Sequence, residues 1–267
     1  MFPISDSDLK TRKRPIVNLA LIGLCTAAFV YELTLGETER TVFFYQYGLI
    51  PAEVAQGIDY GVLRMPLLDL NIASPIPNWA TMFTSMFIHG GWLHFLVNML
   101  FLWVFGDNVE DRFGHLKYLL FYLAAGVAAV WLQVAVNTTS ETPVIGASGA
   151  IAGVLGAYLV LYPFSRVRTL FIFIFIPLFA RIPAIILLGF WFFIQFFSGV
   201  GSLAPGMDGG GVAYWAHIGG FIMGMGVAVF YRLATGQRIW PRGPSARPPG
   251  WPPDEQETPQ YWRGRRL

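Results

Sequence analysis

The sequence predicts an all-α membrane protein with six membrane-spanning helices, and three observations support that fold class. Hydrophobic residues make up 55% of the 267 residues and charged residues only 13%, whereas an ordinary soluble domain carries about 25% charged residues. The mean hydropathy is +0.52. Long tracts without any charge alternate with short charged segments, which is the pattern of membrane spans separated by loops.

Six apolar segments are candidates for the spans. Several of them are shorter than the roughly 20 residues that a full crossing needs. Short spans interrupted by glycine are expected where a helix starts inside the protein and its backbone lines a wet cavity. We expect the spans at residues 15–35, 92–105, 116–136, 147–162, 182–198 and 213–233.

The first span follows a basic cluster at residues 10–14 and is long enough to cross, so we expect no cleavable signal peptide. Asp6 and Asp8 argue against a mitochondrial transit peptide, which would be poor in acidic residues. Cys25 is the single cysteine and excludes an intramolecular disulfide. Its apolar neighbours favour a buried or lipid-facing position.

The distribution of Lys and Arg predicts the orientation of the chain. With a cytoplasmic N-terminus, sixteen of the eighteen Lys and Arg residues fall inside, and only Arg40 and Arg64 fall outside. This excess indicates that both termini are cytoplasmic, and we expect the plasma (inner) membrane of a bacterium. The chain divides into a basic segment (1–14), a six-helix domain (15–235) and a tail (236–267).

Three segments outside the spans have distinctive compositions. Residues 37–78 form a long outer loop whose aromatic cluster suggests a piece lying in the membrane interface. Residues 169–179 are apolar but too short to cross. Their β-branched alternation and Pro177 suggest a re-entrant or interfacial turn, or an extension of the fifth span. Residues 236–267 are rich in Pro and Arg, which predicts a disordered tail.

Polar residues at membrane depth are few, and each needs a reason, because a charged type costs roughly 2 to 3 kcal/mol there on insertion scales. Ser148 stands between Gly146 and Gly149 at the start of the fourth span. Free backbone N–H groups at a helix start can hold an oxyanion, and glycines let a substrate approach. The alternative interpretation is that Ser148 is an ordinary N-cap serine, a common residue at the start of a helix. The embedded polar residues are His94, Asn98, Gln133, Ser148, Gln195 and His217.

His217 lies near the start of the sixth span, beside Gly220 and Gly224. Small residues four positions apart let two helices pack closely, so this histidine can reach a group on a neighbouring helix. His94 and Asn98 share one face of the second span and could donate hydrogen bonds to an oxyanion. A structural histidine and a polar patch that joins helices are the alternative interpretations.

Other chemistries find little support in the sequence. The four histidines form no HExxH pattern, and no nearby carboxylate or cysteine completes a zinc site. Two embedded carboxylates for an aspartyl protease are absent, as are dinucleotide, P-loop and nucleic-acid signatures. We therefore expect no metal, no cofactor and no nucleic acid. Ser148, His217 and the His94/Asn98 pair instead supply a nucleophile, a base and oxyanion donors, as a dyad without an acidic third member.

These residues resemble the rhomboid family of intramembrane serine proteases over roughly residues 78–230. The resemblance implies Ser148 as nucleophile, His217 as general base, and the Ser148 N–H, His94 and Asn98 as oxyanion donors. Gly146 would belong to the loop that forms the oxyanion hole. Three motifs carry it, in order along the chain: His94-x-x-x-Asn98, Gly146-x-Ser148-Gly149 and Ala216-His217-x-x-Gly220-x-x-x-Gly224.

The resemblance also implies a six-helix rhomboid bundle with a water-filled cavity, and the fifth span as a lateral gate. The expected activity is hydrolysis of peptide bonds in or near transmembrane segments of single-span membrane proteins in the bilayer. Two family features are missing. Trp79 is followed by Ala80 where many members have arginine, and Ala152 stands where some have a tyrosine stacked on the histidine.

Two alternatives of other classes remain. An inactive rhomboid-like protein that binds membrane clients would usually have lost the serine or the histidine, and both are present. A transporter is disfavoured because the chain shows neither an internal repeat nor charges embedded in spans two to six. The sequence leaves the oligomeric state open.

Overall fold

Helices account for most of the structure, and the predicted helical membrane fold is confirmed. The computed structural model describes residues 2–6, 9, 11–65, 68–173, 176–204 and 211–241. Five of its helices are long and apolar enough to cross a membrane, and a sixth apolar helix is shorter. The helices that match the predicted spans are α1 (Ile16–Thr34), α5 (Trp92–Phe113), α6 (His115–Val136), α7 (Ser148–Leu161), α8 (Ala184–Gly201) and α9 (Tyr214–Ala234).

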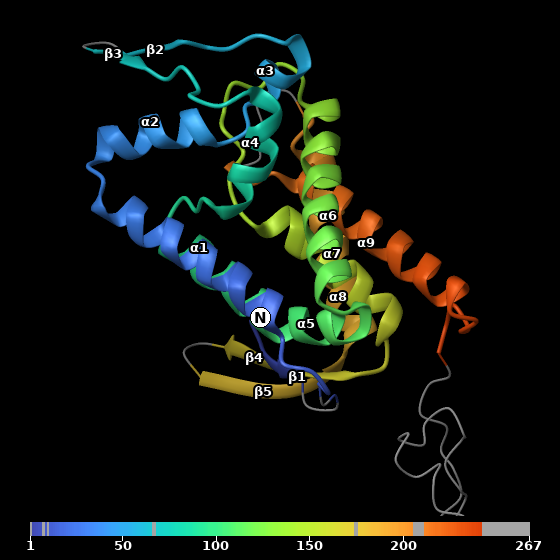
Figure 1. Cartoon of the computed structure of the whole chain (residues 1–267). Helices are drawn as coiled ribbons and strands as arrows, with labels where there is room; N and C mark the ends of the chain where they lie inside the picture. Colours follow the sequence, from blue (N-terminus) through green and yellow to red (C-terminus); the bar gives the residue numbers. More distant parts are fainter. Residues whose placement is uncertain are drawn as a thin grey trace, which may run out of the picture.

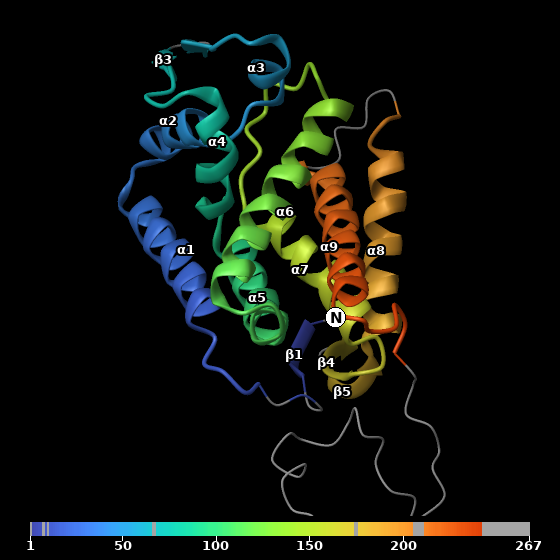
Figure 2. The same cartoon turned by 45° about the vertical axis from the view of Figure 1, so that its right-hand side comes forward.

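The short helix α7 lies at the centre of the bundle and contacts α5, α6, α8 and α9 (Figure 2). All its residues from Gly149 to Leu161 are buried, and many are Gly or Ala, which lets the neighbouring helices approach closely. Fourteen residues make a helix of about 21 Å, less than the roughly 30 Å of a hydrocarbon core. One end of α7 therefore lies within the depth of the bundle.

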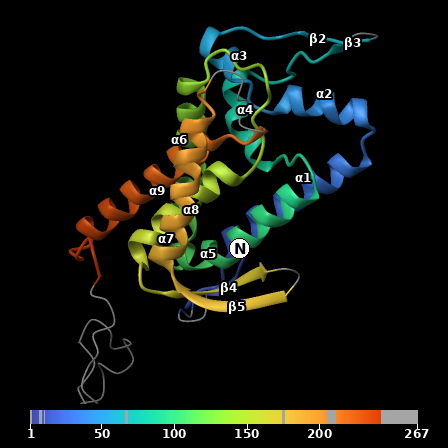
Figure 3. The same cartoon turned by 180° about the vertical axis from the view of Figure 1, so that it is seen from behind.

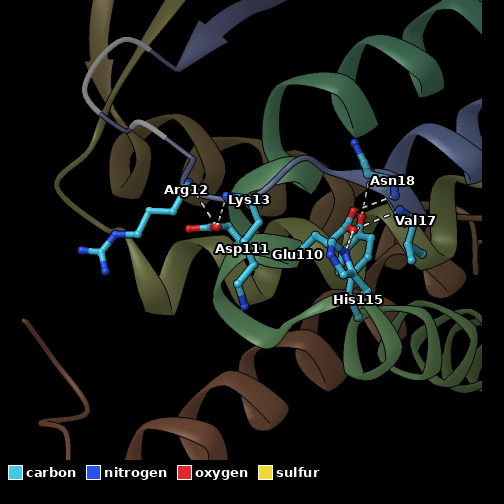
Figure 4. A network of polar contacts seen from close by, with 8 residues as sticks. Arg12, Lys13, Val17, Asn18, Glu110, Asp111 and His115 are labelled. Carbon is cyan, nitrogen blue, oxygen red and sulfur yellow. Dashed lines mark hydrogen bonds and ion pairs between the residues drawn. The ribbon is translucent and has the colours of Figure 1, made fainter. Parts of the chain in front are cut away.

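Helix α5 continues to Phe113, eight residues past its predicted end, because its polar last turns find partners on α1 (Figure 4). The Glu110 carboxylate accepts the backbone N–H groups of Val17 and Asn18 at 2.9 and 2.7 Å. Helix α1 has no side-chain N-cap of its own. Glu110 thus caps the start of α1 from a different helix.

Two further contacts extend this junction. The Asp111 carboxylate accepts the backbone N–H groups of Arg12 and Lys13 at 3.1 and 2.9 Å. The His115 ring contacts Glu110 through Nδ1 at 2.5 Å. The chain before α1 is therefore fixed to the turn between α5 and α6.

A three-stranded antiparallel sheet crosses the end of the bundle where α7 terminates (Figure 1). Its strands, in the order β1-β4-β5, are β1 (Phe2–Asp6), β4 (Arg166–Phe173) and β5 (Ile176–Pro183). Arg168 pairs with Arg181 across the β4–β5 hairpin. Residues 169–173 and 176–179 thus belong to strands and are not an extension of the fifth span. The alternation of β-branched residues that marked this segment is the strand pattern.

The outer segment between α1 and α5 folds into short elements. They are α2 (Glu37–Tyr47), α3 (Pro51–Gln56), the hairpin of β2 (Val62–Arg64) and β3 (Asp69–Asn71), α4 (Asn78–Thr84) and a 3₁₀ turn, η1 (Ser85–Phe87). Leu49 and Val144 exchange backbone hydrogen bonds of 3.0 and 2.7 Å, and the Ala52 N–H donates to the Ser140 carbonyl. These bonds anchor the outer segment to the loop that precedes Ser148.

The end of the described chain lies against the bundle. Gln237 accepts a hydrogen bond from Arg112, and Arg232 donates to the Arg238 carbonyl at 2.8 Å. Gln237 and Arg238, which the sequence assigns to the tail, therefore contact the helices. The rest of the predicted tail, residues 242–267, lies outside the described residues.

Candidate active site

Ser148 is the first residue of α7 and follows a sharp turn at Gly146. Gly146 has φ +122°, a conformation that residues with a side chain rarely adopt. Its N–H donates to the Ser85 carbonyl at 2.8 Å, which fixes the loop against η1. The Ser148 hydroxyl is thereby held at a helix start, where backbone N–H groups lack intrahelical partners.

His217 lies in the first turn of α9, and close helix packing brings it to α7. A Cβ atom at Gly220 would lie 2.0 Å from the Gly149 carbonyl oxygen, and one at Gly224 would lie 1.9 Å from the Gly153 carbonyl oxygen. No other residue type fits at these two positions without separating the helices. The close approach of α7 and α9 at these two glycines thus brings His217 near Ser148.

The His217 ring has a partner at each nitrogen. Nε2 lies 2.7 Å from Ser148 Oγ, and Nδ1 lies 2.7 Å from the side-chain oxygen of Gln195 on α8. The Trp191 ring lies beside the imidazole, with centroids 5.8 Å apart. Three helices, α7, α8 and α9, therefore meet at this imidazole.

His94 points its Nε2 toward the Gly146 turn. A Cβ atom at Gly146 would lie 2.6 Å from His94 Nε2. His94 Nδ1 accepts the Gly90 N–H at 3.3 Å, so in the neutral ring Nε2 carries the proton. The loop before Ser148 therefore faces a hydrogen-bond donor.

Asn98 lies one turn further along α5 and is buried. Its side-chain nitrogen donates to the His94 carbonyl at 2.7 Å, and the amide has a second N–H. Gln133 on α6 accepts the backbone N–H of Ala216 at 3.2 Å and so holds the first turn of α9. Both residues line the same cavity as Ser148.

His89 is not part of the cavity lining and holds the segment that leads into α5. Its backbone N–H donates to the Glu32 carboxylate at 3.1 Å, and its ring contacts the His94 ring with centroids 5.3 Å apart. Burial and the neighbouring His94 lower the pKa of His89 to about 4, so this ring stays neutral at physiological pH. The sequence offered one clue to the Glu32 contact, an acidic residue in an otherwise apolar helix.

A cavity of about 1130 Å³ joins these groups. Its lining includes Ser148, His217, His94, Asn98 and Gln133. The structure thus brings the predicted nucleophile, base and oxyanion donors to one hollow. Among the described residues, no three His, Cys, Asp or Glu side chains group closely enough to hold a metal ion.

Gln195 is the site residue whose position sequence reasoning did not find. Its polar side chain in an apolar helix marked it as unusual, but nothing in the sequence pairs it with His217. That contact depends on the rotation of α8 against α9. The Trp191 and Gln195 side chains share one face of α8 because they are four residues apart.

The part of the chain that carries the candidate active site is similar to known proteins. Residues 77–234 match the family model for the rhomboid domain. Rhomboid protein 1, mitochondrial, of Saccharomyces cerevisiae is 31% identical over 147 residues, covering 53% of this chain and 38% of that protein. RHOMBOID-like protein 1 of Arabidopsis thaliana is 32% identical over 192 residues, covering 69% of this chain and 44% of that protein.

A bacterial relative carries protease in its name. Rhomboid protease GluP of Bacillus subtilis is 42% identical over 81 residues, which cover 30% of this chain and 15% of that protein. The matched stretches therefore span less than half the length of each of these three relatives.

Proposed function

The chain belongs to the rhomboid family, and on that premise we propose that it is an intramembrane serine endopeptidase. The observation that carries the proposal is the 2.7 Å contact between Ser148 Oγ and His217 Nε2 beside a cavity that His94 and Asn98 also line. A hydroxyl and an imidazole at hydrogen-bond distance are the elements of an activated nucleophile. The donors around Gly146 supply the place for an oxyanion.

The first step forms an acyl-enzyme. His217 Nε2 takes the proton of the Ser148 hydroxyl while Oγ attacks the carbonyl carbon of the scissile bond. The negative charge that develops on the carbonyl oxygen is stabilised by the Ser148 N–H, His94 Nε2–H and the Asn98 amide. His217 then gives its proton to the leaving nitrogen as the C–N bond breaks.

The second step releases the acyl group. A water molecule from the cavity gives a proton to His217 and attacks the ester carbon on Ser148. The same donors hold the second oxyanion, and the proton returns to Ser148 Oγ as the ester bond breaks. The cycle needs no metal and no cofactor, because every proton passes through His217.

We propose single-span membrane proteins as substrates, because the site lies at the depth of a short helix inside a membrane bundle. Among the five long apolar helices, α8 has the smallest buried share, which supports it as the side of substrate entry. The excess of Lys and Arg on one side supports cytoplasmic termini in a bacterial plasma membrane.

The test is cleavage of a reporter single-span substrate in membranes by wild type, Ser148→Ala and His217→Ala at equal expression. We expect each variant to lose at least about a thousandfold in rate, because each removes one half of the dyad. Ser165→Ala, in the loop that follows the opposite end of α7, is the control and should cleave like wild type. Cleavage by Ser148→Ala would show that another residue is the nucleophile. If wild type and both variants fail alike on several substrates, the client-binding function replaces the protease.

A further inference from the structure

The proton on His217 is placed by a contact outside the dyad. An amide oxygen only accepts hydrogen bonds, so the 2.7 Å contact between Gln195 Oε1 and His217 Nδ1 requires the proton on Nδ1. The other nitrogen, Nε2, then presents a lone pair to the Ser148 hydroxyl 2.7 Å away. This is the tautomer that a general base needs.

Among the described residues, Gln195 Oε1 is the acceptor within hydrogen-bond distance of His217 Nδ1, and no charged group lies nearby in the cavity. The ionisable side chains lining it, besides His217, are His94 of α5 and Tyr214 of α9, and the described lining holds no Asp, Glu, Lys or Arg. Ala152 offers only a methyl group. Trp191 contacts the imidazole face but has no acceptor for Nδ1.

We propose that Gln195 is a positioning residue that fixes the tautomer and the orientation of His217. The inference rests on the proposed function, because it assigns a role in the same reaction. Gln195 occupies the place that an acidic third member holds in a triad, but it carries no charge. It therefore orients the imidazole but stabilises its protonated form less than a carboxylate would.

The position of Gln195 depends on how α8 packs on α9. Trp191, Gln195 and Gly199 recur every four residues and form one stripe on α8. A Cβ atom at Gly199 would lie 3.2 Å from Ile218 Cδ1, so the stripe faces α9 along its length. In the view from behind, α8 stands at the outside of the bundle, and its lower end joins β5 (Figure 3). The orientation of the base is thus coupled to the docking of a peripheral helix.

Two substitutions at Gln195 separate positioning from packing. Gln195→Leu keeps a side chain of similar size and removes the acceptor, so we expect kcat to fall about 10- to 100-fold with KM unchanged. Gln195→Glu restores an acceptor at the same place and should recover most of that loss. A residue that only packs against α9 would tolerate Leu at least as well as Glu.

The pH profile gives a readout that packing alone does not move. A carboxylate beside the ring favours the protonated imidazole, so the acid limb of kcat/KM in Gln195→Glu should move up by about 1 to 2 pH units. Gln133→Leu is the matched control, because Gln133 accepts the Ala216 N–H next to His217 without touching the ring. It should lower stability and leave the acid limb at its wild-type pH.

Labelling of purified protein with a fluorophosphonate probe measures the same base without a peptide substrate. Ser148 Oγ forms the bond to phosphorus, fluoride leaves, and His217 takes the proton. Slower labelling of Gln195→Leu with recovery in Gln195→Glu supports the proposal. Equal rates for Leu and wild type, or an unmoved acid limb in Glu, overturn it. If wild type is neither labelled nor active, the protease function itself is wrong.

Discussion

Gly146 shows how a single residue controls the candidate site. Its φ of +122° turns the chain into α7, and its missing side chain leaves room for the ring of His94. Elsewhere in the outer segment, Gly57 also has a positive φ, +68°, but a Cβ atom there would meet nothing within 4 Å. Both positions therefore favour glycine, but they differ in what a side chain would displace.

We predict that Gly146→Ala lowers kcat about 100-fold, because the added methyl group displaces His94, one of the proposed oxyanion donors. Gly57→Ala places a side chain in the left-handed region at a conformational cost of roughly 1 to 2 kcal/mol, and should leave kcat unchanged. Cleavage rates of the two variants in membranes, normalised to folded protein, test the difference. Equal rates would mean that the added methyl group leaves His94 in place.

At the scale of elements, the contact between α7 and α9 fixes the distance within the dyad. The two backbones touch at Gly220 and Gly224, where the obstructing atoms are carbonyl oxygens of α7. Backbone atoms cannot rotate away as flexible side chains can. In a bilayer such close packing replaces the hydrophobic driving force that soluble helices use.

Gly224→Ala should force α9 away from α7 and lower the free energy of unfolding by about 1 to 3 kcal/mol, with loss of cleavage. The control lies two residues along the same helix. Gly226→Ala meets nothing within 4 Å and adds helix propensity. Unfolding midpoints in detergent and cleavage rates should fall for Gly224→Ala only. A Gly224→Ala variant as stable as Gly226→Ala would contradict the close contact.

At the scale of the whole molecule, polar contacts join segments that are distant in sequence. The Glu110 carboxylate caps α1, and the Asp6 carboxylate of β1 accepts hydrogen bonds from Tyr158 and Ser165 (Figure 4 shows the Glu110 junction). These carboxylates gather at the end of the bundle away from Ser148. We therefore expect them to stabilise the fold and to take no part in peptide hydrolysis.

Glu110→Ala should lower the free energy of unfolding by about 1 to 3 kcal/mol, because the Val17 and Asn18 N–H groups lose their buried acceptor. Protein that remains folded should cleave at the wild-type rate. Glu37→Ala, at an exposed position of α2, removes the same charge with little effect on stability. Denaturation curves in detergent decide the point. A stable Glu110→Ala variant would show that α1 does not depend on this cap.

The features that the sequence predicted correctly are those that depend on neighbouring residues along the chain. The apolar segments located all six helices, because span length and charge are properties of consecutive residues. The end of α5 was missed, since its polar last turns are helical only in contact with α1. The β4–β5 hairpin was missed because its apolar alternation also suits a turn or a helix extension. Its partner β1 lies about 160 residues away in sequence.

The sequence by itself determined the membrane class, the six helices and the candidates Ser148 and His217, because apolar length and short motifs are local. The tertiary structure alone decided that Gln195 meets His217, that Glu110 caps α1, and that residues 2–6 form a strand. Each of these depends on how one element is rotated or placed against another. Such placement follows from packing over the whole bundle, which no stretch of sequence contains.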